Sequence, residues 1–206
     1  MYGKEKILAG AIALLTASTL GAAANEKVTF GTNWLAEPEH GGYYQAIADG
    51  TYAACGLDVT IMQGGFMPNQ FLLADNGWET YATTIEVMQD TIDKRPEVVQ
   101  CFVDGSAKGW YNYLYGNNKT ANEMIKKDNP DMTDEQIAFS IEQLKKFGIV
   151  DSGDSEKLGI GAMTDARVQS FYDKMVKAKV AQPGIDIKKA YTLAFINKGV
   201  GRELKK

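Results

Sequence analysis

The segment from Lys27 to Gly65 constrains the fold of this chain more than any other. Val28–Phe30 is β-branched and alternating, which predicts a first strand, and residues 57–61 predict a second. Pro38 and its acidic neighbours begin a helix between them, and Gly56 ends it. This order predicts two adjacent parallel strands joined by a right-handed crossover. We therefore expect an α/β domain whose first turn, between a strand end and a helix start, is placed to hold a small ligand.

The turn itself carries side chains suited to a polar heterocycle. Trp34 can stack on an aromatic ring, and Asn33 and Glu37 can form hydrogen bonds with its polar edge, while glycines at the helix start allow close approach. The candidate ligand-binding residues are Asn33, Trp34, Glu37, His40, Gly41, Gly42 and Tyr44. Two alternatives stay open, because Trp34 could instead pack in a core and His40, the only histidine, could be a capping or surface residue.

The remainder of the chain is expected to be mostly helical. Helices are predicted at residues 96–115, 133–148 and 165–178, the second opened by a capping box of Thr133 and Gln136 and the third capped by Thr164. Short strands are predicted at residues 71–73, 81–85 and 191–196. No repeat or low-complexity tract divides the chain, so we expect one domain over residues 25–206.

Residues 1–24 have the pattern of a secretory signal peptide. Two lysines precede an uncharged, mostly apolar run at residues 7–20, and Ala22–Ala24 supplies the small residues of a cleavage site. The run is short for a membrane span, although a retained membrane anchor is the alternative. We therefore expect export to the periplasm, with the mature chain starting near Asn25.

Composition and motifs argue against several function classes. The formal net charge is −4 and the basic residues are scattered, so we expect no nucleic-acid partner. One histidine and no Gly-x-Ser-x-Gly motif argue against a serine hydrolase, and the His and Cys clusters that metals prefer are missing from the sequence. We expect a protein that is not an enzyme and has no cofactor or metal.

The two cysteines are expected to be separate thiols. Cys101 falls on an apolar stretch of a predicted helix, with Val98, Val99 and Phe102, where packing in a core is its ordinary role. A disulfide with Cys55 is the alternative that a periplasmic location allows.

Several blocks of sequence resemble one family. Residues 32–46, 49–52 and 56–59 resemble the first βαβ unit of the bacterial substrate-binding proteins related to the pyrimidine-precursor (hydroxymethylpyrimidine) synthases of thiamine biosynthesis; residues 71–75, 81–85, 102–104, 109–116, 149–153 and 159–167 resemble their carboxy-terminal part. The resemblance implies an α/β fold of the periplasmic-binding-protein type II. It also implies the solute-binding component of an ABC importer, with a thiamine-related pyrimidine or similar small heterocycle as ligand and an inner-membrane permease as partner.

The resemblance further implies that a central segment is missing. Residues 60–65 resemble the end of the family's second strand and residues 66–71 the return from its second lobe, so the two are fused near Gly65. The chain would keep a single lobe with a helical C-terminal half. Two alternatives follow. One is a shortened relative without useful ligand binding; the other, less favoured, is a pyrimidine-precursor synthase, which would need the missing central segment.

Overall fold

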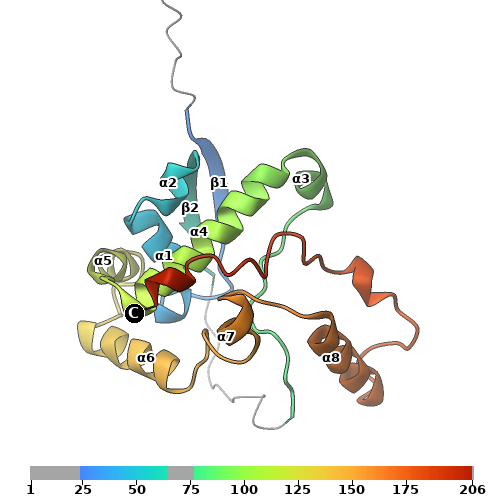
Figure 1. Cartoon of the computed structure of the whole chain (residues 1–206). Helices are drawn as coiled ribbons and strands as arrows, with labels where there is room; N and C mark the ends of the chain where they lie inside the picture. Colours follow the sequence, from blue (N-terminus) through green and yellow to red (C-terminus); the bar gives the residue numbers. More distant parts are fainter. Residues whose placement is uncertain (1–23, 65–76, 206) are drawn as a thin grey trace, which may run out of the picture.

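The fold is mixed α/β, with one small parallel sheet among helices (Figure 1). The computed structural model describes residues 24–64 and 77–205. Within them, β1 (Glu26–Gly31) pairs in parallel with β2 (Leu57–Met62), with Val28 opposite Val59. The predicted pair of adjacent parallel strands is confirmed. The predicted strand at 71–73, the join near Gly65 and nearly all of the predicted leader lie outside the described residues.

Three short helices connect the two strands, whereas the sequence predicted one helix. These are η1 (Pro38–His40), α1 (Gly41–Ala48) and α2 (Thr51–Ala54). The break falls at Gly50, whose φ of 73° is left-handed. The Asp49 carboxylate then accepts a hydrogen bond from the Thr51 N–H at 3.1 Å, which starts α2.

Eight further helices follow in the described residues, and three of them were predicted from the sequence. They are α3 (Gln89–Lys94), α4 (Pro96–Tyr115), α5 (Lys119–Asp128), α6 (Asp134–Lys146), α7 (Asp154–Leu158), α8 (Asp165–Lys177), η3 (Ile187–Lys189) and η4 (Arg202–Leu204). The capping box before α6 is present, since Thr133 Oγ1 accepts from the Gln136 N–H at 3.2 Å and Gln136 Oε1 accepts from the Thr133 N–H at 2.9 Å. The three long helices predicted from sequence are confirmed. None of the described helices is long and apolar enough to cross a membrane.

The strands predicted at residues 81–85 and 191–196 are wrong, because both segments are irregular. Thr83 has a φ of 20°, far from the extended region. The Tyr81 hydroxyl accepts a hydrogen bond from the Thr164 N–H at 2.8 Å, which directs this segment to the start of α8. The second segment turns back on itself, with the Ile196 N–H bonded to the Leu193 carbonyl at 3.4 Å. This segment also accepts a hydrogen bond at its Phe195 carbonyl from Gln100 Nε2 at 3.0 Å, so in both segments tertiary contacts replace the strand partner that an apolar pattern alone suggests.

The expectation of two separate thiols is also wrong. Cys55 and Cys101 form a disulfide, with their Cα atoms 6.2 Å apart. The bond joins the turn after α2 to α4, and Cys101 is half-buried where a core position was expected. The packing of α2 on α4 brings the two side chains together, which the sequence pattern does not show.

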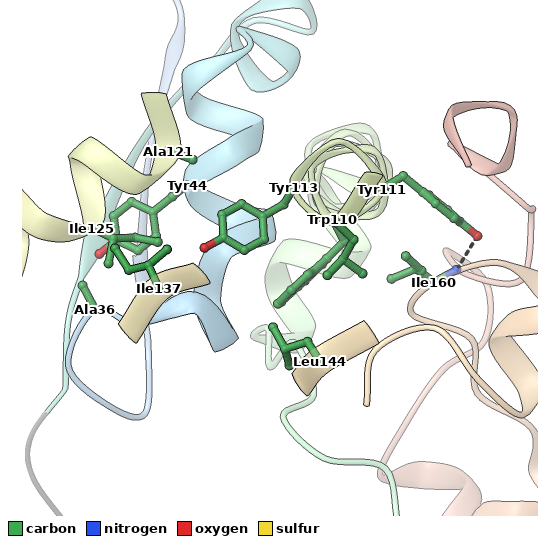
Figure 2. Packing of buried hydrophobic residues seen from close by; sticks show 11 residues of the cluster. Ala36, Tyr44, Trp110, Tyr111, Tyr113, Ala121, Ile125, Ile137, Leu144 and Ile160 are labelled. Carbon is green, nitrogen blue, oxygen red and sulfur yellow. Dashed lines mark hydrogen bonds between the residues drawn. The ribbon is translucent and has the colours of Figure 1, made fainter. Parts of the chain in front are cut away.

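Aromatic packing of α4 against the sheet and α1 forms the core. The Phe102 ring stacks on Tyr52 with centroids 5.1 Å apart and lies 5.1 Å from the ring of Phe30 in β1. Farther along α4, Trp110, Tyr111 and Tyr113 leave the helix in different directions, toward Leu144, Ile160 and Tyr44 (Figure 2). One helix therefore joins the sheet, α1, α6 and the segment after α7.

Candidate functional site

The predicted ligand-binding turn lies at the carboxyl end of β1, where the chain passes the end of β2. The Trp34 carbonyl accepts hydrogen bonds from Thr32 Oγ1 at 2.9 Å and from the Gly64 N–H at 2.8 Å. Asn33 is exposed, and Trp34 and Glu37 are half-buried. These three side chains therefore belong to a surface turn at the strand ends, which is where parallel sheets commonly hold ligands.

His40 is deeply buried and pairs with Asn33. Its Nε2 lies 3.2 Å from Asn33 Oδ1, and the residue is only 3% exposed. Burial lowers the pKa of His40 to about 4, and the backbone at Leu35 offsets this only in part. The imidazole is therefore neutral near pH 7. His40 is neither a surface residue nor a side-chain cap of α1.

The Glu37 carboxyl is expected to titrate near neutral pH. Burial raises its pKa from 4.5 to about 7, and the charge of Glu39 contributes further. Near pH 7 this carboxyl can therefore accept hydrogen bonds from an amino group or donate one to a ring nitrogen. It is the titratable group of the turn best suited to recognising a polar heterocycle.

Gly41, Gly42 and Tyr44 lie on the packed side of α1. A Cβ at Gly41 would meet the Tyr113 ring at 2.0 Å, and one at Gly42 would meet the Trp110 ring at 2.2 Å. Tyr44 is 1% exposed and donates a hydrogen bond to Asp128 Oδ2 at 3.1 Å. The structure thus brings Asn33, Trp34, Glu37 and His40 to one turn and places the other three candidates against α4 and α5. Ligand binding by those three stays a prediction.

Three residues that meet α1 from elsewhere in the chain were not predicted. Trp110 and Tyr113 occupy the space above the two glycines, and Asp128 receives the Tyr44 hydroxyl. No local pattern marks them, because each lies more than sixty residues along the chain from its partner. The small size of Gly41 and Gly42 was the available signal, since adjacent glycines at a helix start allow a neighbouring helix to approach closely as well as a ligand.

Two surface hollows lie away from the turn. A small one is lined by α4 and residues 195–200, and an open one of about 410 Å³ is lined by α8, Pro183 and Gly184. Among the described residues, no group of three or more His, Cys, Asp or Glu side chains could hold a metal ion. The turn after β1 therefore remains the candidate site with the clearest chemistry.

Comparisons with known proteins identify no relative: no family model, curated protein or solved structure matches the chain.

Proposed function

We propose that this chain binds a small polar heterocycle, such as an aminopyrimidine, at the turn of residues 33–37. The observation that carries the proposal is the position of Glu37, a half-buried carboxyl in the turn after β1 beside Trp34, where burial raises its pKa to about 7. A carboxyl group that is available in both protonation states can pair with the amino group and ring nitrogen of an aminopyrimidine. The half-buried Trp34 supplies a ring face for stacking beside it.

The proposed physiological role is that of a solute-binding component of an ABC importer, working with an inner-membrane permease. The resemblance of residues 32–46 and 109–116 to substrate-binding proteins of the pyrimidine-precursor type supports this role. The Cys55–Cys101 disulfide supports an oxidising compartment such as the periplasm, in agreement with the signal-peptide pattern of residues 1–24. As part of the same proposal, the chain has a periplasmic-binding-protein type II fold that is reduced to one lobe.

Binding through one lobe is expected to be weak. Two-lobed binding proteins close over their ligand and exclude water, whereas an open turn leaves the ligand hydrated on one side. We expect a dissociation constant no tighter than roughly millimolar, about 4 kcal/mol. Inserting the central segment of a full-length relative between Gly65 and Phe66 is expected to restore tight binding.

A titration of the full chain with hydroxymethylpyrimidine, followed by NMR and calorimetry, tests the proposal. The other ligands to be titrated are a pyrimidine without the amino group, nitrate, taurine and other sulfonates. Trp34→Ala is expected to weaken binding by about 1–3 kcal/mol with the fold intact, because one ring face is lost. Unchanged affinity would remove Trp34 from the site, and loss of folding would instead make it a core residue.

The second candidate is a shortened relative without useful ligand binding. The packing of Gly41, Gly42 and Tyr44 against α4 and α5 favours it, because those three predicted contacts face protein in this structure. The same titration separates the two candidates. Absence of any NMR shift at Trp34 and Glu37 at ligand concentrations on the order of ten millimolar would support the second.

A further inference from the structure

Two side-chain amides from distant parts of the chain fix the turn between β1 and η1. We infer that Gln63 and Asn129 are positioning residues, which hold the backbone of Ala36 and thereby orient Trp34 and Glu37. The ligand-binding part of this inference rests on the proposed function. The conformational part does not, because the geometry of the turn is measurable without a ligand.

Both backbone groups of Ala36 are bound by these amides. The Ala36 N–H donates to Gln63 Oε1 at 2.9 Å, and the Ala36 carbonyl accepts from Asn129 Nδ2 at 2.9 Å. Ala36 is 0% exposed, so water cannot easily replace either partner. A buried peptide group that loses its partner is destabilised, and therefore any shift of this turn is opposed at both groups.

The two amides are also connected to each other. Gln63 Nε2 donates to the Asp128 carbonyl at 2.7 Å, and Asn129 is the next residue. Ala36, Gln63 and the end of α5 therefore close a ring of three hydrogen bonds. Reversing the Gln63 amide would set its NH₂ against the Ala36 N–H and its oxygen against the Asp128 carbonyl, so these partners determine its orientation.

The same end of β2 holds the other side of the turn. Gly64 follows Gln63, and its N–H donates to the Trp34 carbonyl at 2.8 Å. A Cβ at Gly64 would lie 2.7 Å from the Thr32 carbonyl oxygen, so the two backbones meet closely here. Trp34 and Glu37 are thus on either side of a fixed peptide. A binding residue held in this way loses less conformational freedom when a ligand arrives.

The test uses the full chain with Gln63→Met and Asn129→Leu, which keep side-chain size and remove the hydrogen bonds. Gln63 is exposed and Asn129 half-buried, so we expect both variants to fold. The Ala36 amide, followed by NMR hydrogen exchange relative to the core amide of Tyr113, is expected to exchange at least about tenfold faster in Gln63→Met. Affinity for hydroxymethylpyrimidine is expected to fall about tenfold in each variant.

Two further variants separate positioning from general stability. Thr133→Ala removes the cap of α6, four residues beyond Asn129, and should lower stability without changing the relative exchange of Ala36 or the affinity. Gln63→Glu keeps an acceptor for the Ala36 N–H and loses the donor to Asp128, so it should restore most of the Ala36 protection.

The outcomes distinguish this inference from the proposed function. Unchanged relative exchange of Ala36 in Gln63→Met would overturn the inference whatever the chain binds. Faster exchange with unchanged affinity would overturn the positioning role. If the unmodified chain binds no heterocycle while exchange is faster in the variants, the proposed function fails and the conformational role of the two amides stands.

Discussion

α4 and α8 are both amphipathic helices, yet they are held in different ways. α4 buries residues from Val99 to Leu114 along its length, whereas none of the 13 residues of α8 is buried. Figure 1 shows α4 crossing the middle of the molecule and α8 at its edge. Burial of apolar side chains on several sides stabilises α4. α8 therefore depends on a few specific contacts.

One group of contacts joins α8 to residues 78–81. The Arg167 guanidinium lies 4.5 Å from the centre of the Tyr81 ring. Its Nε donates to the Glu79 carbonyl at 3.2 Å, and its Nη2 donates to the Thr80 carbonyl at 3.1 Å. The Trp78 and Phe171 rings meet edge to face at 5.6 Å. A regular helix pattern in the sequence therefore does not indicate how cooperatively that helix unfolds with the rest of the protein. We expect α8 to open before the core does.

Stability should fall most when the close contact between α4 and α1 is disturbed. A Cβ at Gly109 would lie 2.1 Å from the Gly42 carbonyl oxygen and 2.7 Å from the Ala46 Cβ. Gly109→Val should therefore lower the free energy of unfolding by about 3 kcal/mol or more, measured by urea denaturation. Gly31→Ala is the control, because a Cβ at that position would have nothing within 4 Å. Equal stability of the two variants would contradict the close packing.

Loss of the disulfide between the turn after α2 and α4 should have the second largest effect on the free energy of unfolding. Replacing both Cys55 and Cys101 with Ala removes a cross-link between residues 46 apart in sequence. We expect a loss of about 2–4 kcal/mol in the free energy of unfolding, mainly because the unfolded chain gains freedom. Reducing agent should lower the melting temperature of the wild type and leave the variant unchanged. If the wild type does not respond to reduction, the cysteines are not paired.

Two threonine helix caps should behave differently in the two regions. Thr133 Oγ1 accepts from the Gln136 N–H before α6, and Thr164 Oγ1 accepts from the Arg167 N–H before α8. Thr133→Ala should lower the global free energy of unfolding by about 1 kcal/mol. Thr164→Ala should instead accelerate hydrogen exchange within α8, with little change in global unfolding. Equal global losses would show that α8 unfolds together with the core.

The pH dependence of wild-type stability between about 4.5 and 6.5 should be smaller still, because burial raises the pKa values of Glu37 and Glu39 and lowers that of His40. Glu37, raised from 4.5 to a pKa of about 7, contributes stability below pH 4.5 that is lost as the pH rises through 7. His40, lowered from 6.5 to a pKa of about 4, contributes stability above pH 6.5 that is lost as the pH falls through 4. The two slopes have opposite signs across this window.

Replacing both Glu37 and Glu39 with Gln should expose the contribution of His40, because burial also raises the pKa of Glu39 and gives it the same sign as Glu37. In this variant the free energy of unfolding should rise with pH from about 4 to 6.5, whereas the wild type stays nearly level. Urea denaturation at several pH values measures the difference. A level profile in the variant would show that His40 is not held neutral by burial.

The sequence predicted those parts of the fold that depend on local chemistry. Three such features are each encoded within a few neighbouring residues, and all are present. They are the alternating strand β1, the capping box of Thr133 and Gln136, and the Thr164 cap. The predictions of strands at 81–85 and 191–196 were wrong because a strand also needs a partner strand. Residues of these segments instead form hydrogen bonds with Thr164 at the start of α8 and with Gln100 in α4.

For the candidate site, the sequence determined the residue types of the turn and its place between a strand and a helix. Tertiary structure decided which of them face the turn. Rings from α4 cover Gly41 and Gly42, burial sets the opposite pKa changes of Glu37 and His40, and the disulfide follows from how α2 packs on α4. These properties depend on distances between residues far apart in the chain, and desolvation and packing arise only when the chain has folded.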